Sequence, residues 1–184
     1  MLRGGKMFLL LLVLALGEST PKPVDWQKML PVLRPILLAE FQDMRQAIYP
    51  ISIDHTADLT GTGTSEALVD LGVGGASTDE MTVVRMEGNH PVVALFKDKR
   101  GKISTMTFLD GSSVMHGDGV ELLPKEHAVY SSQWSMDGEG MLANCSGEAY
   151  RWTAQSKTFD FNLRLSHRLT QDFCRNISAS LLRH

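Results

Sequence analysis

Short apolar segments separated by glycine-containing turns fill the middle of the chain, and this spacing constrains the fold more than any other feature. The segments are 81–86, 91–97, 103–109, 120–123, 128–134, 141–146, 148–153 and 159–165. Such closely spaced strands are typical of antiparallel sheets, in which a tight turn joins neighbours. A parallel sheet needs long crossover connections, and these turns leave no room for them. The middle of the chain therefore predicts an antiparallel β-meander.

The clearest hairpin joins segment 148–153 to segment 159–165. In the second segment, apolar and polar residues alternate strictly; the apolar ones are Phe159, Phe161, Leu163 and Leu165. Tyr150 and Trp152 would meet this face across the hairpin, where aromatic pairs stabilise a sheet by about 0.2–1 kcal/mol each.

Two segments outside the predicted sheet have the period of a helix. Near the N-terminus, Asp25 can cap a short turn that Pro31 interrupts, and Pro35 suits the start of a second helix. An apolar stripe follows, at Leu37, Phe41, Met44 and Ile48, before Pro50 ends it. Near the C-terminus, apolar residues recur every four positions, at Leu169, Phe173, Ile177 and Leu181. We therefore expect an α+β fold, with an antiparallel β-meander sheet, an N-terminal helix and a C-terminal helix.

The first 17 residues have the pattern of a secretory signal peptide. Arg3 and Lys6 precede an uninterrupted apolar run, Met7 to Leu16, and Gly17 supplies a small residue for cleavage. The run is too short to cross about 30 Å of hydrocarbon as a helix. We therefore expect residues 1–17 to be a signal peptide and 18–184 a single domain, secreted or periplasmic, with no membrane span after cleavage.

The two cysteines agree with export, and the mild negative charge limits the class of partner. Cys145 and Cys174 form an even pair, which in an exported protein favours a disulfide. A bond between them would stabilise the fold by about 3–4 kcal/mol, on the chain-entropy estimate. After residue 17 the chain has 16 basic and 21 acidic residues. This balance argues against nucleic acid as a partner, because nucleic acid selects basic surfaces.

The segment Asp58-Leu-Thr-Gly-Thr-Gly-Thr-Ser-Glu66 resembles the calcium-binding loops of FG-GAP and VCBS-type repeats in exported proteins. Those loops place carboxylates at the first, third, fifth and ninth positions and glycine at the sixth. Asp58, Gly63 and Glu66 match, and the resemblance implies calcium bound at Asp58 and Glu66. Thr60 and Thr62 replace the other two carboxylates. Because calcium affinity depends on ligand charge and number, we expect a turn of the same shape with weak or absent calcium binding.

A second polar, glycine-rich segment runs from Asp110 to Gly119, and we expect it to be a loop. It holds Ser113, His116 and Asp118, the residue types of a hydrolytic triad or a small metal site. Residues this close in sequence rarely reach triad geometry. The chain has no G-x-S-x-G motif and no H-E-x-x-H motif.

These observations favour a non-catalytic role. The organisation of the chain resembles that of small exported bacterial proteins of unassigned function, a resemblance that implies no mechanism. We expect an exported protein, without a cofactor other than calcium, that binds a protein, envelope component or glycan. The alternative is a small exported hydrolase or metal-dependent enzyme that uses the Asp58 loop or the Asp110–Gly119 loop.

Overall fold

The computed structural model of the chain describes residues 24–42, 44, 50–74 and 78–181. The predicted signal peptide lies outside this part. Two helices, α1 (Trp26–Glu40) and α2 (Leu163–Leu181), flank one sheet. The strands are β1 (Ser52–Ala57), β2 (Glu66–Gly74), β3 (Thr78–Glu87), β4 (His90–Val93), β5 (Phe96–Lys97), β6 (Ile103–Ser104), β7 (Phe108–Ser112), β8 (His116–Leu123), β9 (Ala128–Met136), β10 (Leu142–Thr153) and β11 (Thr158–Phe161).

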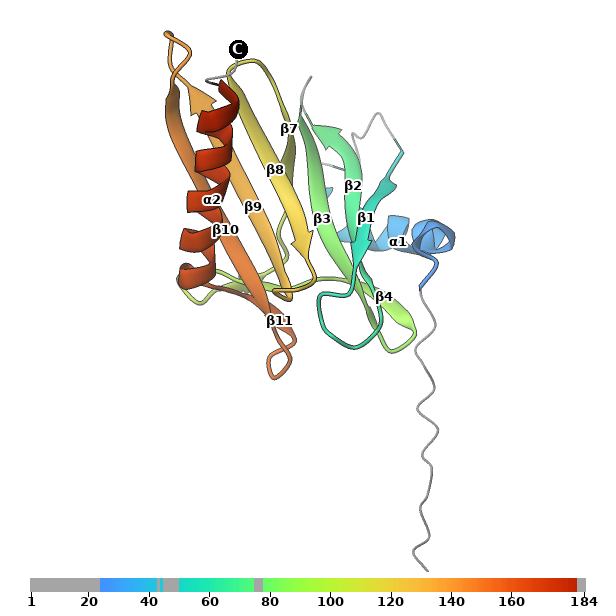
Figure 1. Ribbon diagram of the computed structural model, residues 1–184. Coiled ribbons are helices and arrows are strands. Elements are labelled where there is room, and N and C mark those ends of the chain that lie inside the picture. The colour runs from blue at the N-terminus through green and yellow to red at the C-terminus, as the bar shows by residue number, and fades with distance from the viewer. Residues whose placement is uncertain (1–23, 43, 45–49, 75–77, 182–184) are drawn as a thin grey trace, which may run out of the picture.

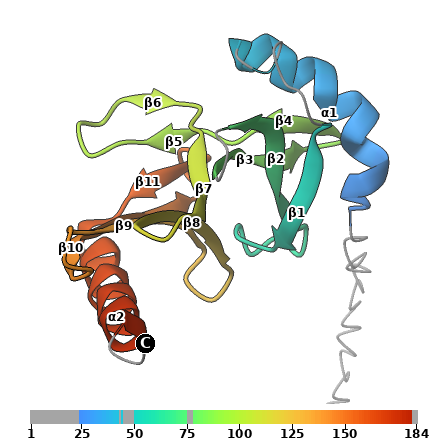
Figure 2. The ribbon, with the colours of Figure 1, turned by 90° about the horizontal axis from the view of Figure 1, so that it is seen from above.

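The sheet is mostly antiparallel, and the predicted α+β class is confirmed. Its strand order is β1-β2-β3-β7-β8-β9-β10-β11-β5-β6, and β4 pairs with the second half of β3. Strands β7 to β11 form a meander (Figure 1). The parallel pair is β11 with β5, which brings Phe159 beside Phe96. Seen from above, α1 lies beside β1 to β4 and α2 lies beside β9 and β10, on opposite sides of the molecule (Figure 2).

Two hydrophobic clusters share strand β2, because alternate residues of a strand face opposite sides of a sheet. Leu68 belongs to the first cluster, in which the rings of Phe96, Phe108, Tyr150 and Phe159 pack together. Ala67, Val69 and Leu71 face the other way and pack against Trp26, Leu33 and Leu37 of α1. The apolar run that follows the Asp58 loop is thus buried on both faces.

Helix α1 differs from the prediction at both prolines. It runs without a break through Pro31 and Pro35, begins after an Asp25 cap, and ends at Glu40 rather than at Pro50. A proline leaves the carbonyl four residues earlier without its helical partner. Both prolines are exposed and lie on one face of α1, four residues apart, so these carbonyls remain hydrated. Predicted stripe residues Leu37 and Met44 are buried, whereas Ile48 lies outside the described residues.

The final strand is shorter than its alternating pattern indicates. Strand β11 ends at Phe161, and Leu163 and Leu165 belong to α2 instead. Asn162 is responsible, because its side-chain oxygen accepts a hydrogen bond from the Leu165 backbone N–H at 2.9 Å. This is an N-cap, and it starts a helix where the polarity pattern alone extends a strand.

Helix α2 covers the outer face of β9 and β10 and is held there by polar and covalent links. Ser166 accepts a hydrogen bond from the Ala149 backbone N–H at 2.8 Å, and Thr170 donates one to the Gly147 carbonyl at 3.3 Å. Cys145 and Cys174 form a disulfide, with Cα atoms 5.9 Å apart, which confirms the predicted pair. Such a bond fits an extracellular or periplasmic protein. Neither described helix is both long and apolar enough to span a membrane.

Candidate functional site

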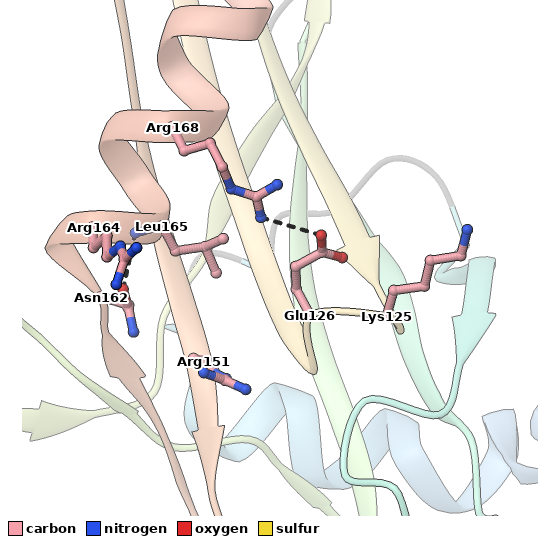
Figure 3. A pocket seen from close by; sticks show the side chains of 7 residues that line it. All are labelled: Lys125, Glu126, Arg151, Asn162, Arg164, Leu165 and Arg168. Atoms are coloured by element: carbon pink, nitrogen blue, oxygen red, sulfur yellow. Dashed lines mark hydrogen bonds and ion pairs between the residues drawn. The ribbon is translucent and has the colours of Figure 1, made fainter.

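A basic pocket lies where the first turns of α2 meet the β8–β9 turn and the end of β10 (Figure 3). Its volume is about 610 Å³. The residues that line it, here called the basic pocket, are Lys125, Glu126, Arg151, Asn162, Arg164, Leu165 and Arg168. The size is within the range of small-molecule sites, which is roughly 300–1,000 Å³.

Local structure places each of the cations. Arg164 and Arg168 are four residues apart on α2, so they lie on the same side of the helix. Arg151 lies on the same face of β10 as Ala149, the residue that hydrogen-bonds to α2. Lys125 lies in the tight turn between β8 and β9, where the His127 backbone N–H donates to the Pro124 carbonyl at 3.3 Å.

The charges in the basic pocket are unbalanced. Four cationic side chains face one carboxylate, Glu126, which pairs with Arg168 at 3.2 Å. Within the described residues Lys125, Arg151 and Arg164 form no ion pair. Arg164 lies in the first turn of α2, which has no acidic residue. A cation there opposes the helix dipole by about 0.3–1 kcal/mol. The basic pocket therefore attracts an anion.

The Asp58 loop is a turn tied together by its own carboxylates. Asp58 accepts hydrogen bonds from the backbone N–H groups of Gly61 and Gly63, each at 2.8 Å. Glu66 accepts from the Leu59 N–H at 2.7 Å and from the Thr60 hydroxyl at 3.2 Å. The described residues contain no group of three His, Cys, Asp or Glu side chains that could hold a metal ion. Calcium at Asp58 and Glu66 stays a prediction.

Glu66 is the most deeply buried carboxyl in this loop, with 2% of its surface exposed. Burial raises its pKa above the ordinary value, and the nearby charge of Asp58 adds to this. The hydrogen bonds from Leu59 and Thr60 act in the opposite direction. The balance leaves the charged form of Glu66 less favourable than it is in water.

The segment from Asp110 to Gly119 is a β-hairpin rather than the expected loop, because β7 ends at Ser112 and β8 begins at His116. The Ser113 hydroxyl accepts hydrogen bonds from the backbone N–H groups of Met115 and His116, both at 3.3 Å. It thus closes the turn, and in the described part of the chain no hydrogen bond joins it to the His116 ring. This geometry does not activate a nucleophile.

The predicted site residues lie at opposite ends of β8. The His127 ring, just beyond the end of β8, makes a 3.2 Å hydrogen bond with the Leu59 carbonyl in the Asp58 loop. His116 begins β8, which is eight residues long and spans roughly 25 Å as an extended strand. Glu66 and Asp118 line different pockets, of about 380 and 340 Å³. The structure therefore does not bring the two predicted loops together.

Asp110 is part of a local concentration of negative charge. Burial raises the pKa of its carboxyl, and the charges of Asp54 and Asp79 raise it further. The described residues include no metal-binding group here either.

Sequence reasoning missed the basic pocket because its cations are dispersed along the chain. The sequence did contain one signal, the four-residue spacing of Arg164 and Arg168. This spacing places the two side chains on one face of a helix only if α2 begins at Leu163. Assigning residues 159–165 to a strand hid this spacing. No family model, curated protein or solved structure matches this chain.

Proposed function

We propose that this chain is an exported, non-catalytic protein that binds an anionic glycan through the basic pocket. The observation that carries the proposal is that four cationic residues from three elements line one open pocket that has a single carboxylate. Arginine guanidinium groups suit carboxylate, sulfate and phosphate groups because their fork donates two parallel hydrogen bonds.

The lining of the basic pocket favours a glycan over a protein surface. Leu165 is its apolar residue, and the other lining residues are charged or amide side chains. Hot spots of protein–protein interfaces are enriched in Trp and Tyr as well as Arg, and this lining offers arginine without an aromatic residue. A sugar polymer that carries acidic groups needs cations and hydrogen-bond donors instead.

The proposed compartment is extracellular or periplasmic. The signal-like pattern of residues 1–17 and the Cys145–Cys174 disulfide support export. Anionic polysaccharides are abundant outside the cytoplasm, so ligand and protein would meet there.

Isothermal titration with heparin, a sulfated glycan, and with polygalacturonate, a carboxylated glycan, tests the proposal. We expect binding at low salt that weakens as salt is added, because the contacts are electrostatic. The double variant Arg151→Ala/Arg164→Ala should lose affinity by about tenfold or more, which corresponds to about 1.4 kcal/mol.

The matched control removes two arginines elsewhere. Arg34→Ala/Arg175→Ala has the same net charge as the pocket variant, and both arginines are exposed on helices outside the basic pocket. It should bind within about twofold of the natural chain if the basic pocket is the site. Equal losses in the two double variants would contradict the proposal, as would tighter binding to poly-glutamate than to either glycan.

A further inference from the structure

A second pocket lies across β10 from the basic pocket. Arg151 and Trp152 are consecutive in β10, so their side chains point to opposite faces of the sheet. Trp152 lines a pocket of about 380 Å³ beneath the Asp58 loop. We call this the threonine pocket. Its lining includes Thr60, Thr62, Thr64, Arg85, Asn89 and Trp152.

Arg85 has an unsatisfied hydrogen-bond donor. The residue is 8% exposed, and its guanidinium lies 5.5 Å from the centroid of the Trp152 ring. Its terminal nitrogens reach the Met86 carbonyl at 3.5 Å and the Glu87 carboxylate at 3.7 Å. Its Nε is buried and has no partner within the described residues. A buried donor without a partner is costly, so the guanidinium would gain from a shift toward an acceptor in the pocket that Arg85 lines.

The charges around Arg85 favour a neutral ligand. Glu87 lies beside the guanidinium, and Glu66 also lines the pocket. Lys157 pairs with Glu87 at 3.0 Å, so two carboxylates are matched by two cations and no excess positive charge remains to attract an anion. The threonine pocket therefore differs from the basic pocket, in which positive charge is in excess.

The remaining polar groups match a hydroxyl-rich ligand. The Thr60 and Thr62 hydroxyls are 2.9 Å apart, and Thr60 also donates to Glu66. In the described part of the chain the Thr64 hydroxyl and the Asn89 amide make no hydrogen bond, so both remain available. Hydroxyl and amide groups donate as well as accept, as sugar hydroxyls do. The Trp152 ring adds a partly exposed aromatic surface.

The threonines sit on a rigid support. Asp58 and Glu66 hold the loop through hydrogen bonds to its backbone N–H groups, which fixes the positions of Thr60 and Thr62 before any ligand arrives. Such preorganisation lowers the entropy lost on binding. We propose that the threonine pocket binds a neutral sugar unit of an oligosaccharide, with the Arg85 guanidinium, Thr64 and Asn89 hydrogen-bonding to its hydroxyls.

Calorimetric titration of the oxidised protein tests this with three probes: the β-1,4 and α-1,4 hexamers of glucose and the β-1,4 hexamer of N-acetylglucosamine. At least one should bind saturably with a Kd of about 1 mM or tighter. Asn89→Ala or Thr64→Val should weaken that binding about fivefold or more, since each removes hydrogen-bonding groups. Thr107→Val, at an exposed threonine outside this pocket, should bind like the natural chain. Thermal melts establish that all the variants are folded.

Failure of all three oligosaccharides to bind would overturn the inference, as would unchanged affinity in both pocket variants. The proposed function is tested separately, because Arg151→Ala/Arg164→Ala should leave neutral-sugar binding intact. If anionic glycans do not bind but a neutral hexamer does, the proposed function of the basic pocket is wrong. The inference about the threonine pocket then still stands.

Discussion

At the scale of single residues, Glu66 shows how this chain uses a carboxylate as a structural acceptor. The group is buried, and its two oxygens take hydrogen bonds from Leu59 and Thr60. Its pKa is raised by burial. A carboxyl whose pKa is higher in the folded than in the unfolded state stabilises the fold most below the unfolded pKa. That contribution is lost as pH rises through the folded pKa.

Glu66→Gln should therefore change the pH dependence of stability. Glutamine retains one oxygen to accept from the backbone N–H groups, and its amide can donate to the Thr60 hydroxyl. The Tm of the variant, relative to that of the natural chain, should rise from pH 4 to pH 8, by a few degrees. Melting curves at both pH values measure this. A difference in Tm that stays constant, or falls, with increasing pH would show that the pKa of Glu66 is not raised by folding.

Gly147 is needed for a different reason, which is close contact with a ring. A Cβ added at Gly147 would come within 2.7 Å of the Tyr130 ring, which packs edge-on against Phe173 of α2. Gly147→Ala should destabilise the fold by about 1–3 kcal/mol, as overpacking does. Gly138→Ala is the matched control, because a Cβ there meets no atom within 4 Å. Chemical denaturation that gives equal stabilities for the two variants would refute this role for the ring contact.

At the scale of elements, α2 is attached to the sheet at two separate places. Near its start Ser166 and Thr170 hydrogen-bond to β10, and further along Cys174 is bonded to Cys145. The basic pocket depends on the first attachment, because Arg164 and Arg168 lie beside it. The disulfide lies further along the helix, so its loss should affect stability more than binding.

Cys145→Ser/Cys174→Ser should lower the free energy of unfolding by about 3–4 kcal/mol, since the disulfide reduces the conformational entropy of the unfolded chain. Affinity for anionic glycans should change by less than about twofold at temperatures where the variant is folded. Denaturation curves and calorimetry measure the two quantities. A thiol assay on the natural, unreduced protein should find no free thiol, and finding two would contradict the bond.

Elements were predictable where one physical signal dominated. The hairpin of 148–153 with the segment that begins at Phe159 was expected from alternation and is present, and the structure pairs Tyr150 with Phe161 and Trp152 with Phe159. The end of β11 was not predictable from alternation, because the Asn162 cap overrides the polarity pattern. The break expected at Pro31 was wrong, because α1 runs through this proline, which lies on the exposed side of the helix while Leu33 and Leu37 pack against the sheet.

At the scale of the whole molecule, the net charge of the chain does not show how the individual charges are distributed over the surface. The chain is net negative, yet four of its cations surround one pocket. Composition could exclude a generally basic surface, but not a local one. Lys125, Arg151 and Arg164 come from a turn, a strand and a helix, so only the tertiary fold brings them together. The Cys145–Cys174 pair was predictable because counting and compartment leave few alternatives.

The parallel contact of β5 with β11 has a consequence for the order of folding. Phe96 in β5 stacks on Phe159 in β11, although strands β6 to β10 lie between them in the chain. Closing so long a loop costs entropy before any contact compensates it, so local hairpins form first and this pairing forms late. Until β11 pairs with β5, the ring face of Phe96 that stacks on Phe159 stays uncovered. The final stage of folding is therefore the one that completes the aromatic core. Partly folded chains in which this pairing is missing are those most prone to aggregate.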